Sequence, residues 1–136
     1  MTSFWEEIPV GATGMNVYSS VPEGEKPFPA VIIAHPASGV AEFTQGIADR
    51  LADSGYVAVA MDLFHRVTDD MISDGTAKNA FLDDFEIISD VDSAVAWAGS
   101  LDSIDSDRIG IIGFCMGGRI AWLSAASNKS FKAVVP

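Results

Sequence analysis

A single cysteine lies in the segment of the chain that most strongly suggests chemistry. Cys115 has Gly113 two residues before it and Gly117 two residues after it. The apolar run 109–114 predicts a strand, and residues 116–127 predict a helix. A Gly-x-Cys-x-Gly segment between a strand and a helix is typical of a nucleophile elbow, a tight turn that presents the nucleophile above the strand ends. The nucleophile's backbone is strained in such a turn, so its two flanking positions must be small.

An elbow of this kind predicts attack of the Cys115 thiol on a carbonyl carbon, with a thioester as the intermediate. The N–H of Met116, at the start of the helix, would donate to the oxyanion. In enzymes built around an elbow, a second donor comes from the loop after another strand, which here is residues 35–40. Ala37 is our candidate for that donor. The alternative is that this loop only connects a strand to a helix.

Other interpretations of the cysteine segment fit less well. A phosphate-binding Walker loop would end in Gly-Lys-Ser/Thr, whereas Gly118 is followed by Arg119. The glycines at 110, 113, 117 and 118 do not give the G-x-G-x-x-G pattern of dinucleotide sites. A structural cysteine in a glycine-rich turn is a further alternative. A redox thiol is another, although the chain has no second cysteine to resolve an oxidised one.

Two histidines and an arginine stand at the carboxyl ends of predicted strands, where open α/β sheets bind ligands. His35 ends the apolar run 29–35, and its position suits either a substrate contact or a contact that supports the site's own residues better than a general base. His65 and Arg66 follow the run 56–61. Arg66 could hold a substrate carboxylate with a two-pronged contact, and His65 could line the same pocket. The alternative for each is a structural or solvated side chain.

The rest of the chain alternates strands and helices, which predicts a single α/β domain over 1–136 with a mostly parallel sheet flanked by helices. Two short β-leaning runs at the start predict an antiparallel hairpin. Phe43, Ile47 and Leu51 predict one helix stripe, and apolar residues at 81, 85, 88, 91, 95 and 98 predict a longer helix with its acids on other faces. The expected strands and hairpin arms are 4–10, 15–21, 29–35, 56–61, 109–114 and 131–135; 67–79 is a polar connection.

Composition narrows the possible functions. The chain has 136 residues, 49% of them hydrophobic, and a net charge of -11, which disfavours nucleic acid as a partner. No window reaches the roughly 18 apolar residues of a membrane span, and the first residues do not form a signal peptide. One cysteine allows no internal disulfide, so we expect a cytoplasmic protein that is a monomer or homodimer. We expect no metal and no cofactor.

Residues 113–119, residues 62–66 and the loop ending at Gly39-Val40 resemble the dienelactone hydrolases (carboxymethylenebutenolidases) of the α/β-hydrolase superfamily. The resemblance follows the family's order along nearly the whole chain. It implies an α/β-hydrolase with a Cys-His-Asp triad that opens small, carboxylated enol-lactones without a cofactor. Cys115 would be the nucleophile, and Met116 and Ala37 would supply the oxyanion hole. Arg66 matches an arginine that binds the substrate carboxylate.

The chain departs from the family pattern in two places. Pro36 stands where well-known members carry a glutamate that helps control the protonation of the thiol. The family's triad Asp and His come after the strand 131–135, so the chain resembles the N-terminal portion only, and we expect this portion alone to be nearly inactive. The alternative is a truncated, non-catalytic relative that serves as a binding module, with its last strand pairing with another chain.

Overall fold

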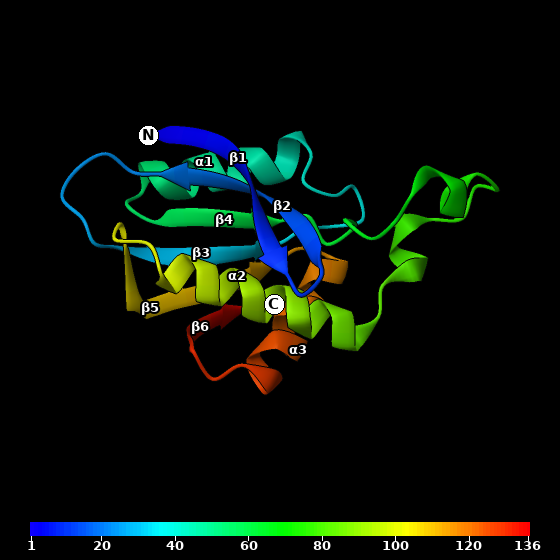
Figure 1. The fold of residues 1–136 in the computed structure, drawn as a ribbon. Helices are drawn as coiled ribbons and strands as arrows, with labels where there is room; N and C mark the ends of the chain where they lie inside the picture. Colours follow the sequence, from blue (N-terminus) through cyan, green and yellow to red (C-terminus); the bar gives the residue numbers. More distant parts are fainter.

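The computed structural model describes residues 1–136 and contains one mixed sheet with three α-helices. Two short 3-10 turns, η1 and η2, interrupt the connection between β4 and α2 (Figure 1). The elements in chain order are β1 (Thr2–Val10), β2 (Thr13–Val21), β3 (Phe28–Ala34), α1 (Glu42–Asp53), β4 (Val57–Met61), η1 (Asp69–Ile72), η2 (Lys78–Phe81), α2 (Asp84–Gly99), β5 (Ile104–Gly113), α3 (Met116–Ser127) and β6 (Phe131–Val135).

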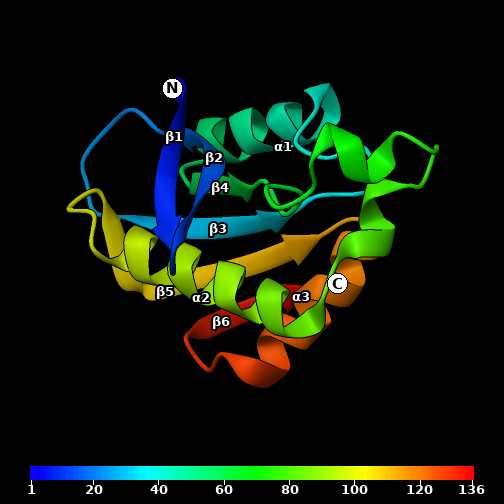
Figure 2. The same ribbon diagram turned by 45° about the vertical axis from the view of Figure 1, so that its right-hand side comes forward.

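The six strands lie in the order β1-β2-β4-β3-β5-β6. β4, β3, β5 and β6 run parallel, whereas the β1–β2 hairpin joins the sheet antiparallel to β4. The predicted hairpin and the mostly parallel sheet are therefore confirmed. The strands β3 and β5 end at the same edge of the sheet, beside the segment between β4 and α2, which is green in Figure 2. This edge is where the chemistry of such a sheet is expected.

Helices cover both faces of the sheet, which explains the continuous apolar runs of its central strands. In β3, the side chains of Ala30 and Ile32 join the larger core under α2 and α3, and that of Ile33 packs on the opposite face under α1. This alternation follows from the two-residue period of a strand. In Figure 1, α2 passes in front of β5, and α1 lies behind the β1–β2 hairpin at the top of the view.

The helix predicted from Phe43, Ile47 and Leu51 is α1, but the buried stripe of α1 is displaced by one residue from the predicted one. The fully buried positions are Thr44, Ala48 and Ala52, whereas Phe43 is 50% exposed. Ile47 and Leu51 are only partly buried, at the margin of the core. The small side chains face the sheet because they let the helix backbone approach it closely, and the large ones spread along its flanks.

The predicted stripe of α2 is confirmed in its second half and wrong in its first. Val91, Val95 and Ala98 are buried, and Ile87 takes the place predicted for Ile88. Phe81 lies before the helix, in η2, and Phe85 is 83% exposed. The largest departure is Asp90, which was placed on an outer face and is 1% exposed. In α3, Ile120 is buried and Ala126 is exposed.

A carboxylate on α1 ties this helix to the β1–β2 hairpin. Asp49 Oδ1 accepts hydrogen bonds from Ser3 Oγ at 2.7 Å, Tyr18 Oη at 3.0 Å and Ser20 Oγ at 2.6 Å. Partial burial by itself would raise the pKa of Asp49, but these three hydrogen bonds outweigh it, that of Ser20 most strongly, so the pKa lies below its ordinary value. The folded state therefore favours the carboxylate.

We expect Asp49→Asn to lower the free energy of unfolding by about 1–2 kcal/mol at pH 7. A pKa that is lower in the folded state adds stability above the unfolded pKa of about 3.9, and that stability disappears as pH falls through the folded pKa. The cost of Asp49→Asn should therefore shrink below about pH 4, which urea unfolding at pH 7 and pH 3 would measure. Asp53→Asn, an exposed acid on the same helix, is the control. An equal cost at both pH values would contradict the account.

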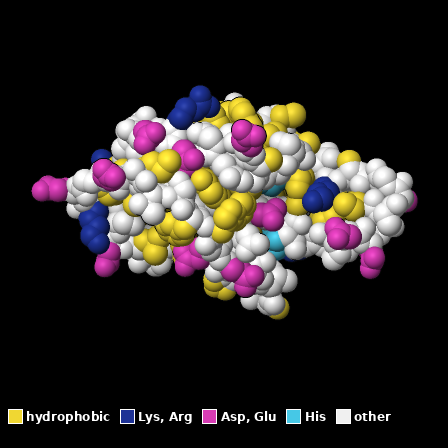
Figure 3. All heavy atoms as spheres, turned by 90° about the horizontal axis from the view of Figure 1, so that it is seen from above, with side chains coloured by type: hydrophobic (Ala, Val, Ile, Leu, Met, Phe, Trp, Pro, Cys, Tyr) yellow, Lys and Arg dark blue, Asp and Glu magenta, His cyan; other side chains and the backbone are white.

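No helix in the structure combines the length and the apolar character that crossing a bilayer requires. The acidic side chains visible in Figure 3 are scattered among apolar and neutral atoms over that face and do not gather in one patch. This distribution suits a charge that mainly keeps the surface hydrated.

Candidate active site

The turn between β5 and α3 has the backbone that an elbow requires. Cys115 has φ 57° and ψ -116°, and it is the only non-glycine residue of the chain with a positive φ. A cysteine pays an energetic cost in this conformation, which structures retain mainly at functional positions. The side chain is exposed, at the N-terminus of α3. The predicted strained turn is thus confirmed.

The two glycines that flank Cys115 are required by close backbone contacts. A Cβ on Gly113 would collide with the carbonyl of Gly117, and it would stand 2.7 Å from the N of Gly118. A Cβ on Gly117 would collide with the carbonyl of Ala34 and lie 2.8 Å from the O of His35. Both neighbours are backbone atoms, which cannot swing away as a flexible side chain would. The start of α3 is therefore packed directly against the end of β3.

This packing brings the β3–α1 loop to the side of the elbow. Phe114 N–H donates to Ala34 O at 3.2 Å, which ties the end of β5 to the end of β3. Ala37 follows in an exposed turn. In this turn, the Gly39 N–H donates to Pro36 O at 2.9 Å. The N–H of Ala37 donates to no acceptor in the chain. As the first residue of α3, Met116 also has no intrahelical acceptor for its N–H.

An aromatic pair includes Phe114, the residue that precedes Cys115. The rings of Phe43, in the first turn of α1, and Phe114, next to Cys115, meet edge to face with their centroids 5.2 Å apart. Phe43 is half exposed, so the pair forms an apolar wall at the surface near the elbow. This position explains why Phe43 is not part of the core.

His35 ties two loops together inside the protein. Its side chain is buried, Nδ1 lies 2.7 Å from Pro36 O, and Nε2 accepts a hydrogen bond from Leu63 N–H at 3.1 Å. Both contacts are satisfied by the neutral ring with its proton on Nδ1. Burial lowers the pKa of His35, and the contact with Pro36 opposes it only in part. With both nitrogens engaged, His35 has none to offer a substrate or the thiol.

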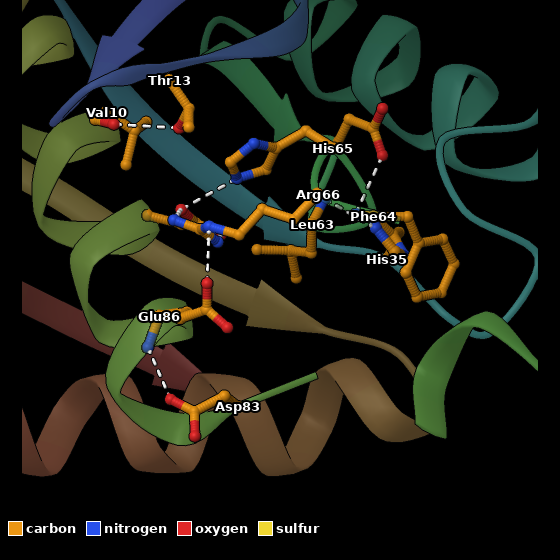
Figure 4. Close-up of polar contacts among 11 residues, drawn as sticks. Val10, Thr13, His35, Leu63, Phe64, His65, Arg66, Asp83 and Glu86 are labelled. Carbon is orange, nitrogen blue, oxygen red and sulfur yellow. Dashed lines mark hydrogen bonds and ion pairs between the residues drawn. The ribbon is translucent and has the colours of Figure 1, made fainter. Parts of the chain in front are cut away.

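His65 and Arg66 lie in a cluster with two acids of α2, which we call the Arg66 cluster: His65, Arg66, Glu86 and Asp90. Figure 4 labels His65, Arg66 and Glu86 of this cluster. Arg66 Nη1 and Nη2 donate to the two carboxylate oxygens of Asp90 at 3.0 and 2.8 Å, and Nε lies 2.8 Å from Glu86 Oε2. Burial alone would lower the pKa of Arg66, but the hydrogen bonds and charge of Asp90, and then the charge of Glu86, raise it.

His65 completes the Arg66 cluster from the other side. Its side chain is 5% exposed, and Nε2 lies 3.0 Å from Asp90 Oδ1. Nδ1 is buried without a partner. The sequence predicted that His65 contacts the substrate and that Arg66 binds a substrate carboxylate. In the structure, both side chains are bound to acids of the protein itself. The sequence reasoning missed Glu86 and Asp90; their spacing of four along a helix was the available signal.

A cavity of about 640 Å³ opens between the hairpin and the loops after β3 and β4. Ala37 and His65 lie in its wall, but Cys115 does not. Its other lining residues are Trp5, Glu7, Gly14, Asn16, Ser38, Gly39, Val40, Ala41, Asp62, Phe64, Val67 and Lys78. The structure therefore packs the elbow against the backbone at the end of β3, and it places Ala37 three residues after that end, in the wall of the cavity. It engages His35, Arg66 and the Nε2 of His65 with groups of the protein.

Comparison of the sequence with known proteins identifies the family of this chain. A sequence model of the dienelactone hydrolase family matches residues 15–136. The chain belongs to this family. A relative from Methylorubrum extorquens named "Putative carboxymethylenebutenolidase" is 36% identical over 137 aligned positions, covering 95% of this chain and 46% of its own length. One of the same name from Escherichia coli K12 is also 36% identical, covering 94% of this chain and 49% of its own.

Superposition on solved structures shows that this chain has the fold of the dienelactone hydrolases. A Klebsiella pneumoniae structure titled "Putative Dienelactone Hydrolase" superposes with a TM-score of 0.85 at 30% identity, over 97% of this chain and 57% of that one. An α/β-hydrolase from Penicillium, 18% identical, superposes with a TM-score of 0.80 and supports the fold alone. The α/β-hydrolase fold predicted from the sequence is thus confirmed. The chain spans about half the length of the curated relatives that it matches.

Proposed function

We propose that Cys115 is the nucleophile of a dienelactone-hydrolase-type enzyme that cleaves small lactones or esters. The observation that carries the proposal is the positive φ of Cys115, which presents an exposed thiol at the N-terminus of α3. Membership of the dienelactone hydrolase family supports hydrolysis as the reaction class. The free N–H of Ala37 and the first N–H of α3, on Met116, suit an oxyanion hole.

In the proposed reaction, the Cys115 thiolate attacks the carbonyl carbon, and the carbonyl electrons move to the oxygen. The N–H groups of Met116 and Ala37 would stabilise that oxyanion. Collapse of the tetrahedral adduct expels the alcohol oxygen, which takes up a proton, and leaves a thioester on Sγ. Water then attacks the thioester, releases the carboxylic acid and restores the thiol. Water is the only co-reactant that this sequence of steps needs.

We further propose that the general base and its orienting acid belong to the part of the family's length that this chain does not span. The chain has two histidines; His35 bonds to Pro36 and Leu63, and His65 bonds to Asp90. Neither is hydrogen-bonded to Cys115. A protein with one reactive thiol suits the reducing cytoplasm, and its state as a monomer or a homodimer stays a prediction.

A second candidate is a non-catalytic binding module. The observation that favours it is β6, which pairs only with β5 and leaves its outer backbone edge without a partner strand. An open edge of this kind can pair with another chain. The turnover experiment separates the two candidates.

That experiment measures hydrolysis of a small lactone and an aryl ester by the 136-residue chain and by a version extended along its own reading frame to the length of its relatives. We expect turnover in the longer form only, and we expect Cys115→Ala to lower it by at least about 10³-fold, the usual scale for losing a triad member. Ser127→Ala, at the far end of α3, is the matched control. Turnover that survives Cys115→Ala would refute the nucleophile, and no turnover in either form would favour the binding module.

A further inference from the structure

The cavity between the hairpin and the loops after β3 and β4 contains charged groups that the protein leaves unpaired. Glu7 and Asp62 lie in its wall, and Lys78 is the only lysine or arginine there. None of these three residues belongs to an ion pair of the chain. Lys78 Nζ instead lies 5.9 Å from the centre of the Phe64 ring. With His65 neutral, the wall therefore carries two negative charges and one positive charge.

The β1–β2 hairpin presents a carboxylate and an amide to this cavity. Gly14 leaves room for the carboxyl group of Glu7, since an added Cβ at Gly14 would stand 2.6 Å from Glu7 Cδ and 2.7 Å from Oε1. Asn16 is the direct cross-strand partner of Glu7. All three residues line the cavity. The side chains of Glu7 and Asn16 therefore stand next to each other on one face of the hairpin.

His65 adds to the same wall a buried polar atom without a partner. Its side chain is 5% exposed, and Nε2 lies 3.0 Å from Asp90 Oδ1. Because a carboxylate oxygen can only accept, this contact places the proton of the neutral ring on Nε2 and leaves Nδ1 as an acceptor. Nδ1 has no donor in the chain, and in Figure 4 it points away from Arg66. A ligand that satisfies Nδ1 must therefore bring a hydrogen-bond donor.

We infer that this cavity binds a neutral, hydroxyl-rich group such as a sugar or another polyol. Hydroxyl groups can donate to the two carboxylates and to His65 Nδ1, and their oxygens can accept from Asn16 and Lys78. Trp5 lies in the same wall and is 49% exposed. Its indole offers a flat surface to the apolar face of a sugar ring. The volume of about 640 Å³ is within the range of sites for small molecules.

Charged ligands match this wall less completely. A carboxylate brings no donor for His65 Nδ1, and the two acids of the wall repel it. An ammonium group can donate to those acids, but it cannot accept from Asn16 or Lys78. Cys115 does not lie in the wall, so this binding site is separate from the proposed hydrolysis.

The test is a titration of the 136-residue chain with methyl α-glucopyranoside, followed by the NMR signals of the N–H groups that line the cavity. We expect shifts of the Ala37 and Gly39 amides and of the Trp5 indole. The matched probe is 2-methoxytetrahydropyran, which has the same ring and methoxy group without the hydroxyls. It should bind at least about tenfold more weakly, as the loss of hydrogen bonds to charged groups predicts. Methyl glucuronide, an anion, and glucosamine, a cation, should also bind more weakly than the glucoside.

Three variants tie the binding to the Glu7 carboxylate. Glu7→Ala should weaken binding of the glucoside about tenfold. Glu6→Ala, which removes the same charge from the opposite face of β1, should leave it unchanged. Gly14→Ala, which displaces the Glu7 carboxyl group, should weaken binding as Glu7→Ala does.

Four results would overturn the inference: no shift of the cavity signals with the glucoside, equal binding of the two neutral probes, tighter binding of either charged sugar, or equal effects of Glu7→Ala and Glu6→Ala. The titration does not involve acylation of Cys115, so its failure would leave the proposed function intact.

Discussion

Replacing Gly117 by alanine is expected to destabilise the chain by about 3 kcal/mol or more, because the added Cβ would overlap backbone that has no room to move. That Cβ would collide with the carbonyl of Ala34 and lie 2.8 Å from the O of His35. The collision can be relieved only if α3 moves away from β3. Such a movement would also withdraw the N–H of Met116 from the elbow, so reactivity and stability should fall together.

Gly46→Ala is the matched control for that substitution. Gly46 lies inside α1, and a Cβ there would meet nothing within 4 Å. The same chemical change should therefore stabilise the protein by about 0.5–1 kcal/mol, the helix preference of alanine over glycine. Urea unfolding of both variants measures the contrast. Equal effects of the two substitutions would show that Gly117 is not needed for close packing at the elbow.

Replacing Asp90 by alanine is expected to cost about 3 kcal/mol of unfolding free energy, because it removes one side of a buried ion pair and leaves the other side uncompensated. Arg66 would lose two hydrogen bonds, and His65 Nε2 would lose its partner while Nδ1 already has none. Asp84 lies on α2, as Asp90 does, and forms an exposed ion pair with Arg119 of α3. Asp84→Ala, which breaks that pair, should cost at most about 1 kcal/mol.

A double variant separates lost charge pairing from lost packing at Asp90. Asp90→Leu combined with Arg66→Met replaces both charges by apolar groups, which often restores or exceeds the original stability. We expect the double variant to unfold at a clearly higher urea concentration than Asp90→Ala. If Asp90→Ala and Asp84→Ala cost the same, the Arg66 cluster does not hold α2 against the β4 loop.

The sequence predicted the sheet and the elbow because both leave local signals. Strands buried on both faces read as continuous apolar runs, and the glycines at 113 and 117 mark the tight turn around Cys115. Helix faces were harder to assign. In α1, counting large apolar residues gave Phe43, whereas the sheet accepts the smaller Thr44 and Ala48.

The Arg66 cluster could not be derived from residue types alone. Asp90 looks like any other solvated acid of α2, and its partner Arg66 lies 24 residues away in the chain. The burial of Asp90 depends on how the β4 loop meets α2, which apolar periodicity does not report. The same reasoning placed His35 and Arg66 correctly at strand ends, but it could not show that protein groups already occupy their polar atoms.

The most direct test of the account is the acylation rate of Cys115 in the folded chain compared with the same chain unfolded in urea. The chain has one cysteine, so the unfolded sample presents the same thiol without the elbow. The reagent is para-nitrophenyl hexanoate, and each rate is corrected for the ionised fraction of thiol through its own pH dependence. Stabilisation of the oxyanion by the Met116 and Ala37 N–H groups predicts folded acylation faster by about 10²-fold or more. A folded rate equal to or below the unfolded rate would contradict the claim that this elbow is built for nucleophilic attack.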